Sequence, residues 1–273
     1  MADSAVAPDD VARLSLVEAL AAIDRGVSPV APIERDLASA VGCTLAADAV
    51  IESGALTVRL TGARLRHVDI ALLDGGTTRV SVRVPKFFVV GDGAVGALIA
   101  GAIESNGGMA VITDTPLAVA LDNPSVDAVV AIGKYTLARD IGKSGRIDFD
   151  GVAVNPGGAT AFGNAHDRPV LILPAELDGA LAGWLTVGRR LLARLAFRLI
   201  EEQPFLLELA RPVASKRGIA EVVPVRRRAA QVEPLVGDTW TTHSIARADG
   251  WLLVPADSEG LPAGAKVQMR PWP

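Results

Sequence analysis

A short glycine turn, Gly91-Asp92-Gly93, is the first segment of this chain whose residue types could do chemistry. Glycines let a backbone approach an anion closely, and the Asp92 carboxylate could bind a metal ion or a hydroxyl. The stretch Gly91–Gly96 also matches G-x-G-x-x-G, but no acidic residue ends a second strand about 20 residues on, as a dinucleotide site requires. A strand-to-helix turn that needs glycine only for its conformation explains the segment about as well.

Two further turns carry groups that could bind a ligand but no charged side chain. Ser105-Asn106-Gly107 offers a hydroxyl, an amide and backbone N–H groups. In Asn155–Gly163, Pro156 makes the backbone rigid, and Gly157 and Gly158 have no side chains. A phosphate or a flat ring could therefore lie against this backbone. Ordinary turns remain the alternative for both segments.

Apolar strands separated by helical stretches must position these turns. The runs 87–90, 128–132 and 170–173 are rich in Val, Ile and Leu, which is typical of a parallel sheet covered on both faces. Gly133 and Pro174 follow two of these strands directly. Because ligands of open parallel sheets bind beyond the carboxyl ends of the strands, we expect all three turns at that edge.

The rest of the chain divides into an arm and a terminal domain around this sheet. We predict an N-terminal arm in residues 1–84, an α/β domain in 85–212 and a small β-rich, barrel-like domain in 213–273. The spacing of apolar residues and turn formers further predicts helices over 13–25, 33–47, 66–73 and 176–202, a Ser15/Glu18 capping box, a turn at 74–76, and strands near 49–51, 78–84, 221–225, 251–254 and 266–269.

Composition excludes several classes of protein. No apolar run approaches the roughly 18 to 20 residues of a membrane span, and the acidic start does not resemble a signal peptide, so we expect a cytoplasmic protein. The single cysteine, Cys43, excludes an internal disulfide, and the three scattered histidines favour surface imidazoles over a metal site. A net charge of -4 argues against nucleic-acid binding, and Arg226–Arg228 is interpreted as a hairpin or strand edge.

Taken in order, segments along nearly the whole chain resemble the MoeA family. Residues 15–20 through 45–50 are similar to that family's "SLDEAL…GRVLAEDV" arm, and 62–66 with 69–73 to "GTxLRPQDIALL". Residues 89–93 stand at "STGDEL", 105–107 at "DSNGPM", 155–162 at "KPGKPLAFG" and 172–174 at the start of "GLPGNPVS". Residues 244–250 with Val254-Pro255 closely resemble "SLARADGLIVLP".

This resemblance implies a molybdopterin-binding MoeA/MogA-like α/β domain and a role in completing the molybdenum cofactor. Family members transfer molybdenum from molybdate to molybdopterin, usually adenylylated, with Mg²⁺, and act as homodimers; a molybdoenzyme or another cofactor-biosynthesis protein is a further implied partner. Asp92 would be the catalytic residue and would serve magnesium or the pterin nucleotide. The implied ligand-binding residues are Gly91, Gly93, Ser105, Asn106, Gly107, Gly133, Lys134, Pro156, Gly157, Gly158 and Pro174.

Departures from the family pattern keep more than one function open. The family's lid domain is absent between Val50 and Gly62, and Asn155 and Gly158 replace the two lysines of "KPGKP". Lys134 or Arg139 could supply replacement cations. The sequence is therefore compatible with a minimal molybdenum-insertion enzyme, with a non-catalytic molybdopterin carrier that delivers cofactor to a molybdoenzyme, and with a scaffold that binds no pterin.

Overall fold

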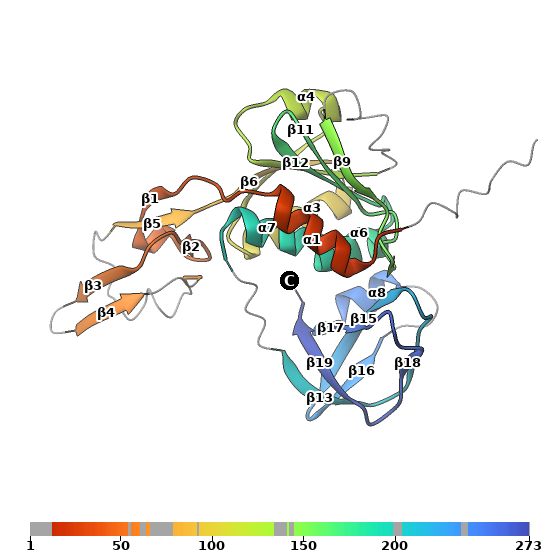
Figure 1. The fold of residues 1–273 in the computed structure, drawn as a ribbon. Coiled ribbons are helices and arrows are strands. Elements are labelled where there is room, and N and C mark those ends of the chain that lie inside the picture. The colour runs from red at the N-terminus through yellow and green to blue at the C-terminus, as the bar shows by residue number, and fades with distance from the viewer. Residues whose placement is uncertain are drawn as a thin grey trace, which may run out of the picture.

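Valine- and isoleucine-rich runs in the middle of the chain build a six-stranded sheet (Figure 1). Its strands are β6 (Lys86–Val90), β7 (Met109–Thr113), β8 (Ala128–Ile132), β9 (Gly145–Asp150), β11 (Ala161–Ala165) and β12 (Arg168–Leu173). Their order is β7-β6-β8-β12-β11-β9. In that order, the first four strands are parallel to one another, whereas β11 is antiparallel to both β12 and β9. The predicted parallel strands are thus confirmed, and an antiparallel edge extends them.

The computed structural model describes most of the chain. It covers residues 13–53, 56–60, 64–65, 79–91, 93–133, 141, 145–198, 204–235 and 240–272.

Helices cover both faces of this sheet, as its continuously apolar strands predict. On one face lie α1 (Leu16–Gly26), α3 (Gly93–Ser105) and a helical run formed by α6 (Leu177–Gly183), the π-helix η3 (Trp184–Gly188) and α7 (Arg189–Leu195). On the other face, α4 (Leu117–Asp122) packs Leu117 and Leu121 against Val129. Alternate strand residues serve the two faces: Phe87 and Val89 belong to the first core, and Val90 to the second.

The helix predicted over 176–202 is shorter and carries a π turn. The ring of Trp184 lies directly over Gly188, where any Cβ would overlap it, and the helix widens over these residues. Phe197 has a φ of 52°, and the N–H of Arg198 donates to the carbonyl of Ala193 at 2.9 Å. This left-handed closure ends the helix after Leu195.

The helix predicted near the N-terminus is confirmed together with its cap. The Ser15 hydroxyl accepts a hydrogen bond from the N–H of Glu18 at 3.3 Å, and the Glu18 carboxylate accepts one from the N–H of Ser15 at 3.0 Å. The hydrogen bonds from Ser15 lower the pKa of Glu18. This capping box starts the helix at Leu16.

The arm consists mainly of strands. Residues 33–47, for which a helix was predicted, contribute strands to a small sheet. The described strands are β1 (Ile33–Asp36), β2 (Thr44–Leu45) and β5 (Arg79–Arg83), with a hairpin of β3 (Ala49–Ser53) and β4 (Leu56–Leu60) beside them. Only a 3-10 turn at Leu37–Ser39 is helical there, because Leu37 must reach the small core that Val80 and Val82 offer. The predicted strands near 49–51 and 78–84 are confirmed. The helix predicted at 66–73 and the turn at 74–76 lie outside the described residues.

The C-terminal part is a closed β-barrel, in agreement with the barrel-like domain predicted. Its strands include β13 (Phe205–Leu209), β15 (Ala220–Arg228), β16 (Gln231–Pro234), β17 (Gly250–Val254) and β19 (Lys266–Pro271), with short β14 (Val213–Ala214) and β18 (Gly260–Leu261) and the helix α8 (Thr242–Ala246). The pairings run β15-β16-β13-β19-β17 and return to β15. Because β13 belongs to this barrel, the domain starts before residue 213, where it was predicted to begin. Arg226–Arg228 end β15 at its hairpin with β16, as interpreted.

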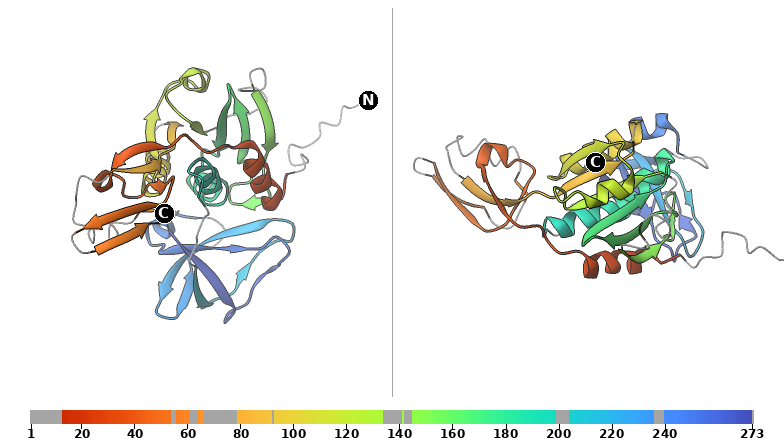
Figure 2. Two further views of the ribbon diagram at one scale, coloured as in Figure 1. Left: turned by 60° about the vertical axis from the view of Figure 1, so that its left-hand side comes forward. Right: turned by 90° about the horizontal axis from the view of Figure 1, so that it is seen from above.

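The three parts have a simple spatial arrangement. The arm joins the sheet through Val84-Pro85, directly before β6, and projects from that end of the molecule in both views of Figure 2. The barrel lies beneath the helical face in Figure 1. Among the described helices, none is long and apolar enough to cross a membrane.

Candidate functional site

The order of the parallel strands marks where a ligand would bind. From β6 the chain passes to β7 on one side and then crosses back to β8 on the other side of β6. At such a switch point the two connections leave in opposite directions, and a crevice opens beyond the carboxyl ends of the adjacent strands. Gly91 follows β6 and Gly133 follows β8, so both predicted residues lie at this switch point.

Close approach of two loops explains the glycines at the switch point. Gly91 and Gly133 have φ values of 135° and 143°, a region that side-chain-bearing residues rarely adopt. A Cβ on Gly91 would lie 3.1 Å from the carbonyl oxygen of Ile132. The N–H of Gly91 donates to Thr113 and that of Gly133 to Leu173, each at 3.1 Å. These hydrogen bonds fix each loop to the end of a neighbouring strand, β7 or β12, so a ligand must use other donors.

The start of α3 provides such donors. Gly93 opens this helix with a φ of 77°, and a Cβ there would meet nothing within 4 Å, so the space beside it is open. The first turn of a helix has N–H groups without intrahelical partners and a partial positive charge. The first turn of α3 contains no acidic residue to compete for that charge. An anion is therefore favoured next to Gly93.

The loop Pro156–Gly158 and Pro174 meet on α6 at the same end of the sheet. A Cβ on Gly179 of α6 would lie 3.0 Å from the Cβ of Pro174 and 3.8 Å from the nitrogen of Gly157. Gly157 itself has a φ of 108° and approaches the nitrogen of Gly183. The structure thus brings Gly91, Gly93, Gly133, Pro174 and the 156–158 loop to the carboxyl end, as predicted. Part of the predicted 155–163 turn is strand, because Ala161–Gly163 pair with β12.

The barrel adds a carboxylate that sequence reasoning missed. β10 (Val154–Asn155) runs parallel to β15 and places Asn155 beside Glu221, where the Asn155 amide donates to the Glu221 carboxylate at 2.8 Å. Burial raises the pKa of Glu221, against the lowering effects of this hydrogen bond and of Lys216. Alternation in the β15 sequence indicates a strand but not its partner, so no local signal pairs these residues.

Arg13 is a second residue that sequence reasoning missed. Its alkyl chain lies over Gly151 and its guanidinium over Gly158, where a Cβ would be 3.0 Å from Nη1. The sequence contains no sign of this contact, since the two segments are far apart in the chain. A cation consequently stands beside the loop Pro156–Gly158.

The prediction that Ser105-Asn106-Gly107 lies at the carboxyl end is wrong. The helix α3 runs without interruption from Gly93 to Ser105, so this turn lies at the opposite end of the sheet, just before β7. The N–H of Gly107 donates to Glu104 at 2.9 Å and the N–H of Gly108 to Ile103 at 3.1 Å, while the Asn106 amide donates to Ala102 at 2.8 Å. The turn is a helix C-cap.

Arginines at this opposite end bind the carbonyl groups of the cap. Arg64 of the arm donates to Gly42 at 3.1 Å and also to the carbonyl of Ser105. Arg198 donates to the carbonyl of Asn106 at 3.0 Å. Burial, together with the charges of Arg64 and Arg189, lowers the pKa of Arg198 to about 10. These arginines join the arm, α3 and the end of the α7 run.

Comparison with known proteins agrees with this architecture. Residues 207–272 match the sequence model of the MoeA C-terminal region, domain IV. The chain therefore has the fold of MoeA proteins, and its C-terminal region resembles MoeA domain IV. A molybdenum cofactor biosynthesis protein from Pyrococcus furiosus superposes with a TM-score of 0.78 at 20% identity, covering 96% of this chain and 100% of that one. A molybdopterin biosynthesis MoeA protein from Pyrococcus horikoshii OT3 gives 0.77 at 16% identity, with coverage of 96% and 100%. Among proteins of curated function, none matches this sequence.

Two predicted site residues, Asp92 and Lys134, lie outside the described residues, as does Arg139. Within the described ranges, no three His, Cys, Asp or Glu side chains stand together in a way that could hold a metal ion. His243 contacts Arg247 at 3.0 Å, and His166 contacts Asp122 at 2.8 Å. Both described histidines therefore have protein partners.

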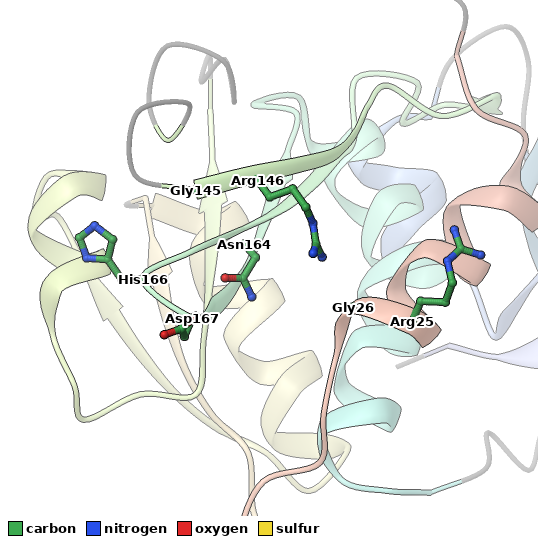
Figure 3. A pocket seen from close by; sticks show the side chains of 7 residues that line it. All are labelled: Arg25, Gly26, Gly145, Arg146, Asn164, His166 and Asp167. Carbon is green, nitrogen blue, oxygen red and sulfur yellow. The ribbon is translucent and has the colours of Figure 1, made fainter.

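A groove among the described residues lies away from the switch point. It has a volume of about 450 Å³ and is lined by Arg25, Gly26, Gly145, Arg146, Asn164, His166 and Asp167 (Figure 3). These residues border the start of β9 and the turn from β11 to β12, at the amino end of β12. Arg146 is held by Asp148 at 3.0 Å, and Arg25 and His166 stand at opposite sides of the groove in Figure 3. Its polar groups do not converge on one point.

Proposed function

We propose that this protein acts in molybdenum cofactor biosynthesis, binding molybdopterin or its adenylylated form at the switch point and inserting molybdenum from molybdate. The observation that carries the proposal is a MoeA-like fold over nearly the whole chain, ending in a domain that matches the MoeA C-terminal region. The barrel adjoins the Asn155 loop through the pairing of β10 with β15, so two domains border one candidate site.

The proposed task of the protein is to hold two anions together. The first turn of α3 and the backbone of the 156–158 loop would bind the phosphate of the pterin, and the bare glycines would receive its flat ring. Molybdate would then react as a bound neighbour, which removes the entropy cost of an encounter in solution. The barrel side contributes Glu221, whose pKa is raised by burial and whose carboxyl group accepts a hydrogen bond from Asn155 next to the 156–158 loop.

Only the resemblance to the MoeA family suggests magnesium, and Asp92 is the expected ligand. The described residues contain no cluster that fits a metal ion, so no step of the proposed mechanism passes through Mg²⁺. The homodimer and a cytoplasmic location are proposals of the same kind, and sedimentation velocity of the purified protein tests the dimer.

A second function, that of a non-catalytic molybdopterin carrier, is favoured by two observations. Asn155 and Gly158 stand where the family has lysines. The hairpin β3–β4 occupies the segment in which the family carries its lid domain. A carrier needs the pterin-binding loops but neither the lid nor a complete molybdate site, and it would hand its ligand to a molybdoenzyme.

Titration of the purified protein with molybdopterin and adenylylated molybdopterin, with and without molybdate and Mg²⁺, separates these functions. Binding that Asp92→Ala abolishes, followed by molybdate-dependent formation of active cofactor, is the result expected of the insertion enzyme. Binding without conversion would identify the carrier. If neither pterin binds at micromolar concentration, both functions are wrong and the chain is a scaffold.

A further inference from the structure

The backbone of the next residue, Leu14, holds Arg13 beside the loop Pro156–Gly158. Leu14 forms a parallel bridge with Val152, and the carbonyl of Leu14 accepts a hydrogen bond from the N–H of Ala153 at 2.7 Å. Leu14 also packs against the main core. The Arg13 Cγ would be 3.3 Å from a Cβ on Gly151, so its alkyl chain crosses that glycine on the way to Gly158.

Gly158 makes room for the guanidinium. Gly151 and Gly157 have positive φ values, which favour glycine for conformational reasons, but Gly158 lies outside that region. A Cβ at position 158 would instead lie 3.0 Å from Arg13 Nη1, and 3.3 Å from both its Cζ and the carbonyl oxygen of Val154. Glycine at position 158 therefore leaves the space in which the Arg13 guanidinium lies against the loop.

The surroundings of this guanidinium suit an anion. In the described part of the chain, Arg13 forms no ion pair with a carboxylate, and its side chain is exposed. The N–H groups of Gly158 and Ala159 donate to no backbone acceptor there, whereas the neighbouring N–H of Thr160 donates to Gly157 at 2.9 Å. A guanidinium fork and adjacent free N–H groups are the donors that recognise a tetrahedral oxyanion.

We propose that Arg13 is an oxyanion-binding residue that, with the backbone of Gly158 and Ala159, replaces the cation missing from the loop. This inference rests on the proposed function, because it names a binding residue of the same site. The ligand group is a tetrahedral oxyanion, which could be molybdate itself or the phosphate of the pterin.

Isothermal titration with three separate probes tests the proposal: sodium molybdate, inorganic phosphate and molybdopterin. The variant is Arg13→Gln, which keeps an alkyl stem and hydrogen-bonding groups but removes the charge. Arg25→Gln is the matched control, because Arg25 is also an exposed arginine of the N-terminal segment and lies at the other end of α1. The double variant Arg13→Gln/Gly158→Lys returns a cation to the loop itself, and circular dichroism verifies that every variant is folded.

We expect Arg13→Gln to weaken binding of at least one probe by about tenfold, the usual loss when a charged hydrogen bond is removed. Arg25→Gln should bind like the unmodified protein, and the double variant should recover much of the lost affinity. A loss confined to molybdate identifies the metal oxyanion as the ligand, and a loss confined to phosphate and molybdopterin identifies the pterin phosphate.

Two outcomes overturn the proposal in distinguishable ways. If molybdopterin binds and Arg13→Gln has unchanged affinity for all three probes, Arg13 has no part in a site that does exist. If the unmodified protein binds none of the probes, the proposed function fails together with the inference.

Discussion

The two ends of the central sheet contain the same residue types but use them differently. At the amino end, the glycine turn after α3 is a helix cap, and Arg64 and Arg198 donate to its carbonyl groups. At the carboxyl end, the N–H groups of Gly158 and Ala159 have no backbone acceptor, and Arg13 has no acidic partner among the described residues. A helix ends in carbonyl oxygens and begins in N–H groups, so arginine completes the structure at one end and remains available to a ligand at the other.

Gly107→Val should have the largest effect on stability, because it disrupts the packing of the turn after α3 against the arm. Gly107 has a φ of 83°, and a Cβ there would overlap the carbonyl oxygen of Gly42 in the arm. A strained backbone and an overlap with main-chain atoms should lower the free energy of unfolding by about 2 to 4 kcal/mol, measured by urea denaturation. The control is Gly101→Ala within α3, where a Cβ meets nothing within 4 Å; it should be neutral or stabilising by up to about 1 kcal/mol. An unchanged urea midpoint for Gly107→Val would contradict the packing described for this end.

Asp24→Asn tests the arginine pairs that join α1 to α7. Arg190 donates to both carboxylate oxygens of Asp24, at 2.7 and 2.6 Å, and Arg194 donates to the Asp24 carbonyl at 2.9 Å. Loss of this bidentate pair should cost about 1 to 2 kcal/mol. Asp257→Asn, an exposed aspartate of the barrel, serves as the control.

The pair should also make stability depend on pH. The hydrogen bond from Arg190 lowers the pKa of Asp24 below its ordinary value. The stability that the pair adds is therefore fully present above about pH 4, the pKa of an unfolded aspartate, and is lost as the pH falls through the lowered pKa. Thermal unfolding followed from pH 7 to pH 3 should show the difference between Asp24→Asn and the unmodified protein shrinking at acid pH. A constant difference would count against the pair.

Glu221→Gln should have a smaller effect of opposite sign, at the carboxyl end. Burial raises the pKa of Glu221, so the folded state disfavours the ionised form and loses stability as the pH rises through that raised pKa. Glutamine can still accept the hydrogen bond from Asn155 without a charge. We expect the melting temperature to rise by at most about 3 °C at pH 7 and to be unchanged near pH 4. Glu208→Gln, an exposed glutamate, is the control, and a lower melting temperature at pH 7 would refute the expectation.

Gly158→Ala should have the smallest effect on stability and sharpens the contrast with Gly107→Val. The neighbour that a Cβ meets first is the mobile end of the Arg13 side chain, which can move aside. The free energy of unfolding should change by no more than about 0.5 kcal/mol in urea denaturation. Oxyanion affinity should fall by a few-fold, since the guanidinium is displaced. A large loss of stability would mean that close packing of the backbone, and not the Arg13 side chain, requires glycine at position 158.

The sequence by itself determined several of the strands and some of their boundaries. The apolar runs of β6, β8 and β12, the Ser15 capping box and the barrel strands are local patterns, and the glycines after β6 and β8 occur where a parallel sheet needs them. The prediction for Ile33–Ala47 failed because the contact of Leu37 with Val80 and Val82 overrode its helical spacing.

Only the tertiary structure decided which predicted site residues share one place. The glycine turn after Ser105 looked equivalent to the other two in sequence, but the length of α3 carries it to the opposite end of the sheet. The roles of Arg13 and Glu221 depend on pairings of Leu14 with Val152 and of β10 with β15, between segments distant in the chain. Local residue patterns determine hydrogen-bonded segments of a few residues, whereas a binding site depends on which segments meet, and the burial of the shared core determines that.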